Sequence, residues 1–351
     1  MTAPIIGQAA VRQVAVDEAG EGQRLDNFLL RHLKGVPKTH VYRIIRSGEV
    51  RVNKARAQAD TRLALGDTVR IPPVRTAQGA QTTQATRSAQ PSVLGADPQA
   101  QGGYTPAREF PVLFEDEAVL AIHKPAGVAV HGGSGVAHGV IEQLRQARPG
   151  ARFLELVHRL DKETSGVLLL AKKRSALVHL QDQFRRSAGQ AGVHKVYAAL
   201  VWGQWPARQK VVDLALHKTL DAAGERHVRV VQADHPDGRR SISLVKVQQA
   251  WPSPEGSGPG VSLVDVTLKT GRTHQIRVHL AHHGHPIVGD PKYGDFALNR
   301  QWARGPLRFG RMFLHARELA FDHPVSGERV TLEAPLPNEC ATLLARLPSA
   351  P

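Results

Sequence analysis

The sequence has very little cysteine, and it lacks both long apolar runs and a recognisable leader. Cys340 is the single cysteine among 351 residues, which excludes an intrachain disulfide and a zinc site of four thiolates. No run of about 18 apolar residues is present, so we expect no membrane-spanning helix. The first ten residues carry neither a basic side chain nor a long apolar run, which argues against a secretory signal. These absences predict a soluble, cytoplasmic protein.

Signatures for cofactors and metals are absent as well. There is no Walker-type loop, no dinucleotide-binding fingerprint and no His-Glu-x-x-His pattern. The glycine-rich segment 132–135 is not followed by Lys-Ser or Lys-Thr, so we interpret it as a loop. A cluster of four histidines has no cysteine nearby, which favours a polar loop rim over a zinc site: His279, His282, His283 and His285. We therefore expect no cofactor and no metal.

Positive charge is what the chain has in excess. Lys and Arg total 46 against 31 Asp and Glu, which gives a formal net charge of +15. Such an excess favours a polyanionic partner, most commonly nucleic acid, over a basic but unspecialised surface. Residues 24–75 hold 12 basic and 4 acidic side chains, a local net charge of +8. This local excess of positive charge predicts a small basic module.

Composition divides the chain into four parts. Residues 1–23 form a tail and residues 24–75 the basic module. Residues 76–109 are rich in Gln, Ala, Thr, Ser and Gly and poor in bulky apolar side chains, which predicts a flexible linker. Apolar patterns resume at Phe110, and residues 110–345 are expected to form one large domain.

The basic module shows two helical patterns and two short strand-like runs. Helical spacing relates Leu25 to Phe28 and Leu29, and then Val41 to Ile44 and Ile45. Gly48 is expected to end the second helix, and strand-like runs follow at 50–52 and 69–71. This arrangement suits a nucleic-acid-binding module, although a solvated basic helix face would give the same pattern.

Three segments of the module are similar to the S4 RNA-binding domain: Arg24-Leu25-Asp26, Ser47 to Asn53, and Leu65 to Val69. The resemblance implies RNA binding and says nothing about chemistry. The basic residues that it implies for RNA contact are Arg24, Lys38, Arg43, Arg46, Arg51 and Lys54.

In the large domain, residues 156–171 form a polar turn between two strand-like runs. Asp161 lies between Arg159 and Lys162, with Thr164 and Ser165 close behind. Cations and hydroxyl groups nearby favour the charged form of a carboxylate, which could then act as a nucleophile or a base. An aspartate that merely caps a turn would leave the same pattern.

Two further segments carry candidate site residues. In residues 275–280, Ile276, Val278 and Leu280 alternate with polar residues, which predicts a strand with Arg277 on its polar face. That arginine could pair with a buried carboxylate or lie on the surface. Residues 194–201 also predict a strand, in which Tyr197 could stack on a base or simply pack within the sheet.

Together these segments resemble the RluA/RluC/RluD family of pseudouridine synthases. The matching stretches are His158-Arg159-Leu160-Asp161 with Thr164-Ser165-Gly166, His123 to Gly127, Lys195 to Val201, Gly271 to His279, and Gly284 to Asp290. Within the family, residues 33–38 and 70–75 look like the RluC type, which modifies 23S ribosomal RNA. Residues 218–237 depart from the family pattern.

The resemblance implies the roles of the site residues. Asp161 is implied as the catalytic carboxylate, Arg277 as its ion-pair partner and Tyr197 as the base-stacking group. Arg159 is implied to fill the stack that the extruded base leaves, and the RNA-contacting set is completed by His158, Thr164 and His274. The reaction is redox-neutral, which agrees with the missing cofactor signatures.

The resemblance also implies an α+β fold, with a mixed, mainly antiparallel sheet and the cleft across its middle. Strand-like runs at 119–123, 167–171, 196–201, 261–268 and 275–280 agree with this. The partner expected is 23S ribosomal RNA, bound by a monomer. Two alternatives stay open: a synthase acting on transfer RNA or another ribosomal site, and a non-catalytic RNA-binding protein of ribosome assembly.

Overall fold

The computed structural model describes residues 11–17, 20–33, 36–74, 105–132, 138–186, 192–220, 226–253 and 259–348. The chain divides into two compact units, of which the first ends at Gly102 and the second begins at Gly103. Most of the expected linker, residues 76–104, lies outside the described residues, as do residues 133–137 of the glycine-rich loop. No helix in the described ranges is long and apolar enough to span a bilayer.

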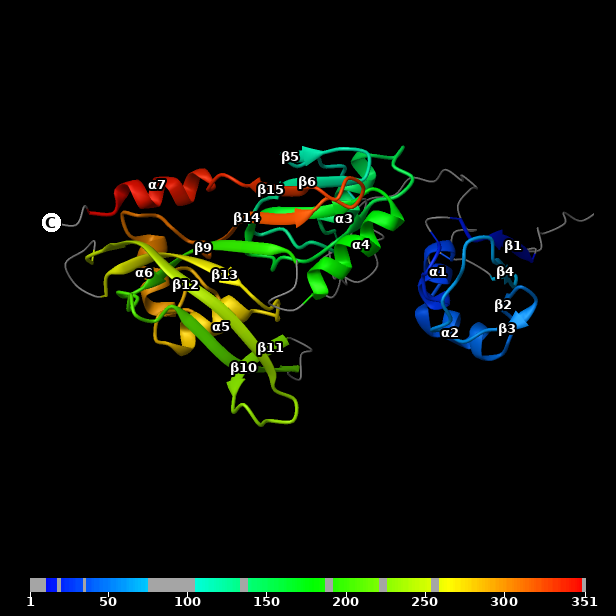
Figure 1. Cartoon of the computed structure of the whole chain (residues 1–351), viewed down its shortest axis with the longest axis horizontal. Coiled ribbons are helices and arrows are strands. Elements are labelled where there is room, and N and C mark those ends of the chain that lie inside the picture. Colours follow the sequence, from blue (N-terminus) through cyan, green and yellow to red (C-terminus); the bar gives the residue numbers. More distant parts are fainter. Residues whose placement is uncertain are drawn as a thin grey trace, which may run out of the picture. The chain divides into compact units, whose positions relative to one another are not determined.

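The N-terminal unit packs two short helices against a small antiparallel sheet (Figure 1). Its helices are α1 (Leu25–His32) and α2 (Lys38–Arg46). Its strands are β1 (Arg12–Ala15), β2 (Arg51–Val52), β3 (Ala55–Arg56) and β4 (Thr68–Ile71), in the order β1-β4-β2-β3. Both predicted helices and the run at 69–71 are confirmed, while strand β1 lies in the stretch that composition assigned to the tail.

The apolar spacing of the sequence explains the core of this unit. Leu25, Phe28 and Leu29 of α1 and Val41 and Ile44 of α2 are all buried in one cluster. Gly48 has a φ of +75°, a left-handed conformation that suits glycine at the end of a helix. The polar sides of the helices are therefore left facing solvent.

The second unit is built on an eleven-stranded sheet with the main order β11-β10-β12-β13-β9-β14-β8-β6-β5. Strand β15 pairs with β14 and β7 with β8. The pair β14–β8 is parallel and the other pairs are antiparallel, which confirms the mixed, mainly antiparallel sheet.

The strands of the large sheet cover most of the second unit. They are β5 (Val112–Glu115), β6 (Val119–Lys124), β7 (Glu155–Leu156), β8 (Ser165–Ala171), β9 (His194–Trp202), β10 (Val211–Leu220), β11 (Arg226–Val231), β12 (Arg239–Trp251), β13 (Val261–Leu268), β14 (Leu314–Asp322) and β15 (Arg329–Glu333). The runs predicted at 119–123, 167–171, 196–201 and 261–268 are thus confirmed as strands.

Helices lie against the two halves of this sheet. They are α3 (Val140–Ala147), α4 (Arg174–Arg185), α5 (Gln275–His282), α6 (Phe296–Arg304) and α7 (Asn338–Arg346). Helix α4 contacts β8 and β14 in one half, whereas α5 contacts β10, β11 and β12 in the other (Figure 1). The two halves meet at β9 and β14, where Tyr197 packs against the apolar clusters of both.

The strand predicted at 275–280 is wrong, because these residues form helix α5. The apolar and polar side chains alternate in sequence but not in exposure, since all six residues from Gln275 to Leu280 are buried. A helix buried on every side leaves no amphipathic pattern by which it could be told from a strand. The expected polar loop rim is also wrong for His279 and His282, which belong to this helix, and His279 is fully buried.

Candidate active site

Asp161 lies in the loop that leads into the central strand β8. The backbone N–H of Thr164 donates to the Asp161 carbonyl oxygen at 3.1 Å, which closes a turn around the aspartate. Buried Lys124 fixes the same turn, because its Nζ donates to the carbonyl oxygens of Lys162, Pro125 and Val128 at 3.1, 2.8 and 2.7 Å. Burial lowers the pKa of Lys124 to about 7. The Asp161 backbone is thereby held from two sides.

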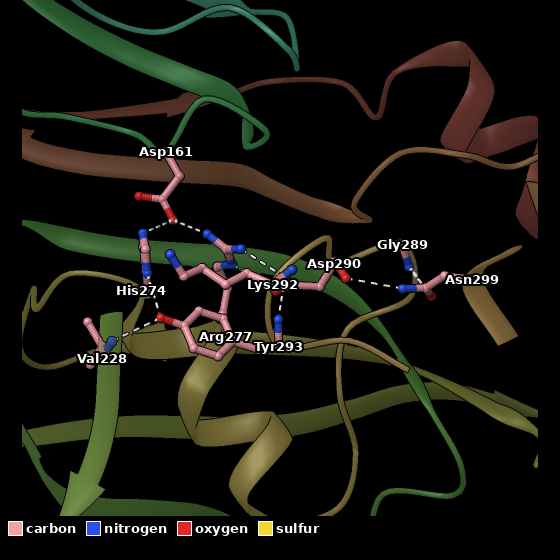
Figure 2. Close-up of polar contacts among 9 residues, drawn as sticks. All are labelled: Asp161, Val228, His274, Arg277, Gly289, Asp290, Lys292, Tyr293 and Asn299. Atoms are coloured by element: carbon pink, nitrogen blue, oxygen red, sulfur yellow. Dashed lines mark hydrogen bonds and ion pairs between the residues drawn. The ribbon is translucent and has the colours of Figure 1, made fainter. Parts of the chain in front are cut away.

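Arg277 rises from helix α5 and contacts two carboxylates (Figure 2). Its Nη1 donates to Asp161 Oδ2 at 3.2 Å. Its Nε and Nη2 donate to the two carboxylate oxygens of Asp290 at 2.7 and 2.8 Å, a bidentate pair that fixes the plane of the guanidinium. Asp290 is fully buried, whereas the side chain of Asp161 is 31% exposed. Asp290 therefore anchors the arginine, and Asp161 stays accessible.

The charges of Arg277 and Asp290 stabilise each other. Burial alone would raise the pKa of Asp290, but the hydrogen bonds and charge of Arg277 and the amides of Tyr293 and Lys292 outweigh burial and lower it. Burial likewise disfavours the charge on Arg277, and Asp290 and Asp161 outweigh it and raise the pKa of the guanidinium. Arg277 therefore presents a fixed positive charge to Asp161.

His274 is a second basic side chain near Asp161, and it is held by Tyr293. His274 Nε2 lies 3.9 Å from Asp161 Oδ2, and its Nδ1 lies 2.8 Å from the Tyr293 hydroxyl, which also accepts the N–H of Val228 at 3.2 Å (Figure 2). His274 has the left-handed φ of +52° at the start of α5. Burial lowers the pKa of His274, so the imidazole is neutral at neutral pH.

These groups line a cavity of about 680 Å³, within the usual range for ligand pockets. Among the described residues, one carboxylate lines it, that of Asp161, together with seven Lys and Arg side chains: Arg159, Arg185, Arg186, Lys195, Lys269, Arg272 and Arg277. Tyr197 of β9 contributes its ring, and burial raises the pKa of its hydroxyl, so the side chain is neutral. The cavity thus offers an aromatic face and an excess of positive charge.

The cavity brings together all the site residues predicted for the large domain. Asp161, Tyr197 and Arg277 line it, and so do Arg159, His158, Thr164 and His274. His158 is held in place, because its Nε2 accepts the N–H of Leu169 at 3.1 Å and its ring stacks on Phe184. Burial, together with the charge of Lys195, lowers the pKa of His158 to about 3.

Sequence reasoning missed the two buried residues that hold the site in place. Asp290 ends the matching segment Gly284 to Asp290, and Lys124 lies within His123 to Gly127, but neither has a role that the sequence predicts. The signal available for Asp290 was that its segment follows the Arg277 helix closely and contains no other carboxylate. For Lys124, the signal was a lysine at the end of a strand that begins with four apolar residues.

The basic residues expected to bind RNA lie in the N-terminal unit, whereas the cavity belongs to the second unit. Arg24 forms an ion pair with Asp26 at 2.8 Å and its side chain is 44% exposed. The others are exposed on α2, on β2 and on the turn from β2 to β3: Lys38, Arg43, Arg46, Arg51 and Lys54. They form a solvent-facing set of cations on one small unit.

Among the described residues, one group has metal-binding donor atoms close together: His217, His235 and Asp237, within 4.8 Å of one another. The Nδ1 lone pair of His235 already accepts the Asp237 amide at 3.1 Å. None of the three lines the cavity.

Comparison with known proteins shows the family of the chain. Residues 118–282 match the family described as RNA pseudouridylate synthase, and residues 23–69 match the S4 domain. The chain is 45% identical over 343 residues to ribosomal large subunit pseudouridine synthase C of Pasteurella multocida, covering 98% of this chain and 95% of the relative. It is also 45% identical to the protein of that name from Escherichia coli K12, covering 97% and 98%. This chain belongs to the RNA pseudouridylate synthase family.

A solved structure shares the fold of this synthase. The human RNA pseudouridylate synthase domain containing 4 is 26% identical, with a TM-score of 0.53, and the match covers 68% of this chain and 92% of the human chain. The synthase is thus an isomerase with an S4 domain at its N-terminal end.

Proposed function

We propose that this synthase converts specific uridines of large-subunit (23S) ribosomal RNA to pseudouridine, with Asp161 as its catalytic carboxylate. The observation that carries the proposal is the placement of Asp161. Within the described part of the chain it is the single carboxylate lining a cavity with seven basic side chains, and Arg277 holds it at 3.2 Å. The ribosomal target is supported by the names of relatives that match nearly the whole chain.

The reaction makes no net change in atoms or in oxidation state. The bond from N1 of uracil to C1′ of ribose breaks, the base rotates, and a bond forms from C5 to C1′. C5 then loses its hydrogen as a proton and N1 gains one. In this proposal Asp161 acts on the base or the sugar, or accepts the C5 proton. In each of these roles the guanidinium of Arg277, whose Nη1 lies 3.2 Å from Oδ2, orients the Asp161 carboxylate.

A uridine within a helix cannot rotate, so the nucleotide must leave the stack, at a cost of a few kcal/mol. Tyr197 offers a neutral aromatic face on which the extruded uracil can stack. Arg159 lines the cavity and is exposed, which suits a side chain that fills the vacated position in the RNA. His158, Thr164 and His274 complete the contact set around the base.

The N-terminal unit supplies RNA affinity in this proposal. Its exposed cations can contact phosphates, which anchor a protein on nucleic acid without reading sequence. We assign residues 24–75 to this RNA anchor, 76–109 to the linker and 110–345 to the catalytic domain. The synthase then acts as a monomer in the cytoplasm, alongside its ribosomal RNA substrate, and needs no cofactor.

Mapping pseudouridine at nucleotide resolution tests the target. Ribosomal and transfer RNA are sequenced from cells with and without this protein, and from cells that express the Asp161→Asn variant instead. We expect particular pseudouridines to disappear from large-subunit ribosomal RNA in both the deletion and the Asn variant. Loss confined to transfer RNA would replace the proposed target, and no loss from either RNA would contradict the proposed function.

A further inference from the structure

Lys195 is a basic residue in the cavity wall whose charge the site described above leaves unexplained. It lies on β9 two residues before Tyr197, so both side chains project from the same face of the strand. Its Nζ lies over the ring of Phe184, 5.5 Å from the ring centroid, and Phe184 in turn stacks on His158 at 4.8 Å and 16°. The lysine is thus held against the wall of the cavity by an aromatic face.

The ammonium group of Lys195 has no acidic partner among the described residues. Two other cations of the cavity do: Arg277 binds Asp161 and Asp290, and Arg185 binds Asp182 at 2.7 Å. Lys195 makes neither an ion pair nor a side-chain hydrogen bond within the described residues, although it is partly buried. Burial lowers the pKa of Lys195, and no carboxylate in the described ranges offsets this effect. Partial burial of a cation without a nearby negative charge raises the free energy of the folded protein. A bound anion would supply that negative charge.

Gly271 lies beside the Lys195 ammonium group. A Cβ placed on Gly271, in the loop between β13 and α5, would lie 3.6 Å from Lys195 Nζ. The same loop carries Lys269 and Arg272, both exposed at the edge of the cavity. Three cations from two elements therefore face one region beside Tyr197 and Asp161.

We propose that Lys195 binds a backbone phosphate of the uridylate that enters the cavity, with Lys269 and Arg272 at the outer edge of the same phosphate site. The inference rests on the proposed function, because the phosphate belongs to the extruded nucleotide. A phosphodiester supplies the missing counter-charge, and its oxygens accept from an ammonium donor. Holding this phosphate fixes the ribose, and with it the C1′ atom, relative to Asp161.

The test uses short RNA substrates that contain a uridine which the wild-type enzyme converts. One substrate has natural linkages, a second has a neutral methylphosphonate on the 5′ side of the uridine, and a third has it on the 3′ side. Single-turnover rates are measured over a range of enzyme concentrations for the full-length wild type, Lys195→Met and Lys195→Arg. The quantity compared is the ratio of the maximal rate to the enzyme concentration that gives half of that rate. Lys246→Met, at an exposed lysine of β12 outside the cavity lining, is the matched control.

We expect one methylphosphonate to lower the wild-type ratio about tenfold, or about 1.4 kcal/mol. Lys195→Met should show a similar loss on the natural RNA and less than about twofold further loss with that methylphosphonate, because this variant has no ammonium group to bind the phosphate. Lys195→Arg should keep most of the wild-type ratio, and Lys246→Met all of it. The position of the sensitive linkage identifies the phosphate as 5′ or 3′.

The proposal is overturned if neither methylphosphonate affects the wild type, a result that needs no folded variant. It is also overturned if Lys195→Met is impaired but still suffers the full tenfold loss, since Lys195 would then only support Phe184 and the wall. Failure of the proposed function looks different, because the wild type would then form no pseudouridine in any ribosomal substrate.

Discussion

Asp161 and Arg277 are separated by 116 residues in the sequence, and their side chains meet at 3.2 Å. Asp161 comes from the loop before β8 in one half of the sheet, and Arg277 from the helix on the other half. The contact therefore requires that both halves pack correctly across β9 and β14. Fold and site depend on each other at this point.

Arg277 is expected to matter through geometry as well as charge. Arg277→Ala should lower the single-turnover rate at least about a hundredfold, or about 2.7 kcal/mol, because Asp161 loses its fixed partner. Arg277→Lys should keep only part of the wild-type rate, since an ammonium group cannot make the bidentate bond to Asp290 while it also reaches Asp161. Single-turnover rates at saturating enzyme concentration measure this. A fully active Lys variant would show that charge alone suffices, and a fully active Ala variant would remove Arg277 from the mechanism.

Asp290 is expected to stabilise the catalytic domain and position Arg277. Asp290→Asn should lower the free energy of unfolding by about 3–5 kcal/mol, because it breaks a buried ion pair and leaves the arginine half paired. The activity of the folded fraction should also fall. Asp213→Asn is the control, since Asp213 makes a similar bond to Arg240 at the surface and should cost less than about 1 kcal/mol. Urea unfolding that gave equal losses for both variants would contradict the anchoring role.

The N-terminal unit is expected to supply the salt-sensitive part of RNA binding. Deleting residues 1–75 should weaken binding to ribosomal RNA and flatten its dependence on salt concentration, by about 0.7–0.9 in the log–log slope for each phosphate that the truncated protein no longer neutralises. Replacing Lys38, Arg43 and Arg46 with Gln should give a smaller change of the same sign. The truncated protein should still modify a short RNA at low salt. An unchanged slope would show that the anchor lies elsewhere, and an unfolded truncation product would show that the two units need each other.

Stability should fall with acidification because three histidines, one in the cavity wall and two fully buried, are neutral in the folded state. Burial, the largest cause in each, lowers the pKa of His158 to about 3 and those of His279 and His315 to about 4, below the ordinary value of 6.5. Between about pH 4 and 6.5 the unfolded chain therefore binds more protons than the folded one. The stabilisation is complete above pH 6.5 and is lost progressively as the pH falls below it.

His279→Gln isolates one of these groups. Glutamine can still bond to Ser241, which His279 Nε2 meets at 2.8 Å, but it does not titrate. The variant should lower the slope of unfolding free energy against pH by about 1.4 kcal/mol per pH unit between pH 4.5 and 6. Chemical unfolding at several pH values measures the slope, and the exposed His282→Gln variant is the control. An identical slope for wild type and His279→Gln would show that His279 is already protonated in the folded state.

Most of the fold was predictable because local patterns and tertiary environment agree. The helices of the N-terminal unit and strands β6, β8, β9 and β13 have the apolar spacing that their burial requires. Helix α5 was not predictable, because a helix buried all round shows no periodicity and its six core residues alternate by chance. Its surroundings, and not its own pattern, decide its conformation.

Motif resemblance predicts the roles of the residues in the site. The buried residues that hold them in place are identified only by the structure. Asp161 and Arg277 lie in segments dense in polar residues, and Tyr197 lies in a matching strand segment. Asp290 and Lys124 are buried. Asp290 accepts a hydrogen bond from Arg277, and Lys124 donates one to the backbone carbonyl of Lys162. Lys162 lies 38 residues from Lys124, and sequence spacing carries no information on such a long-range contact. Asp290 lies only 13 residues after Arg277, so the nearness of the two segments was a usable signal.

The central claim is that Asp161 carries the isomerisation, and Asp161→Asn tests it most directly. Asparagine keeps the size of the side chain and removes the carboxylate. The wild type and the variant are incubated with large-subunit ribosomal RNA labelled with tritium at C5 of uridine, so that tritium released to water counts completed reactions. RNA binding is measured alongside. We predict no release above background for Asp161→Asn, with RNA affinity within about tenfold of wild type, or 1.4 kcal/mol. Sustained tritium release by the Asn variant would contradict the catalytic role of Asp161.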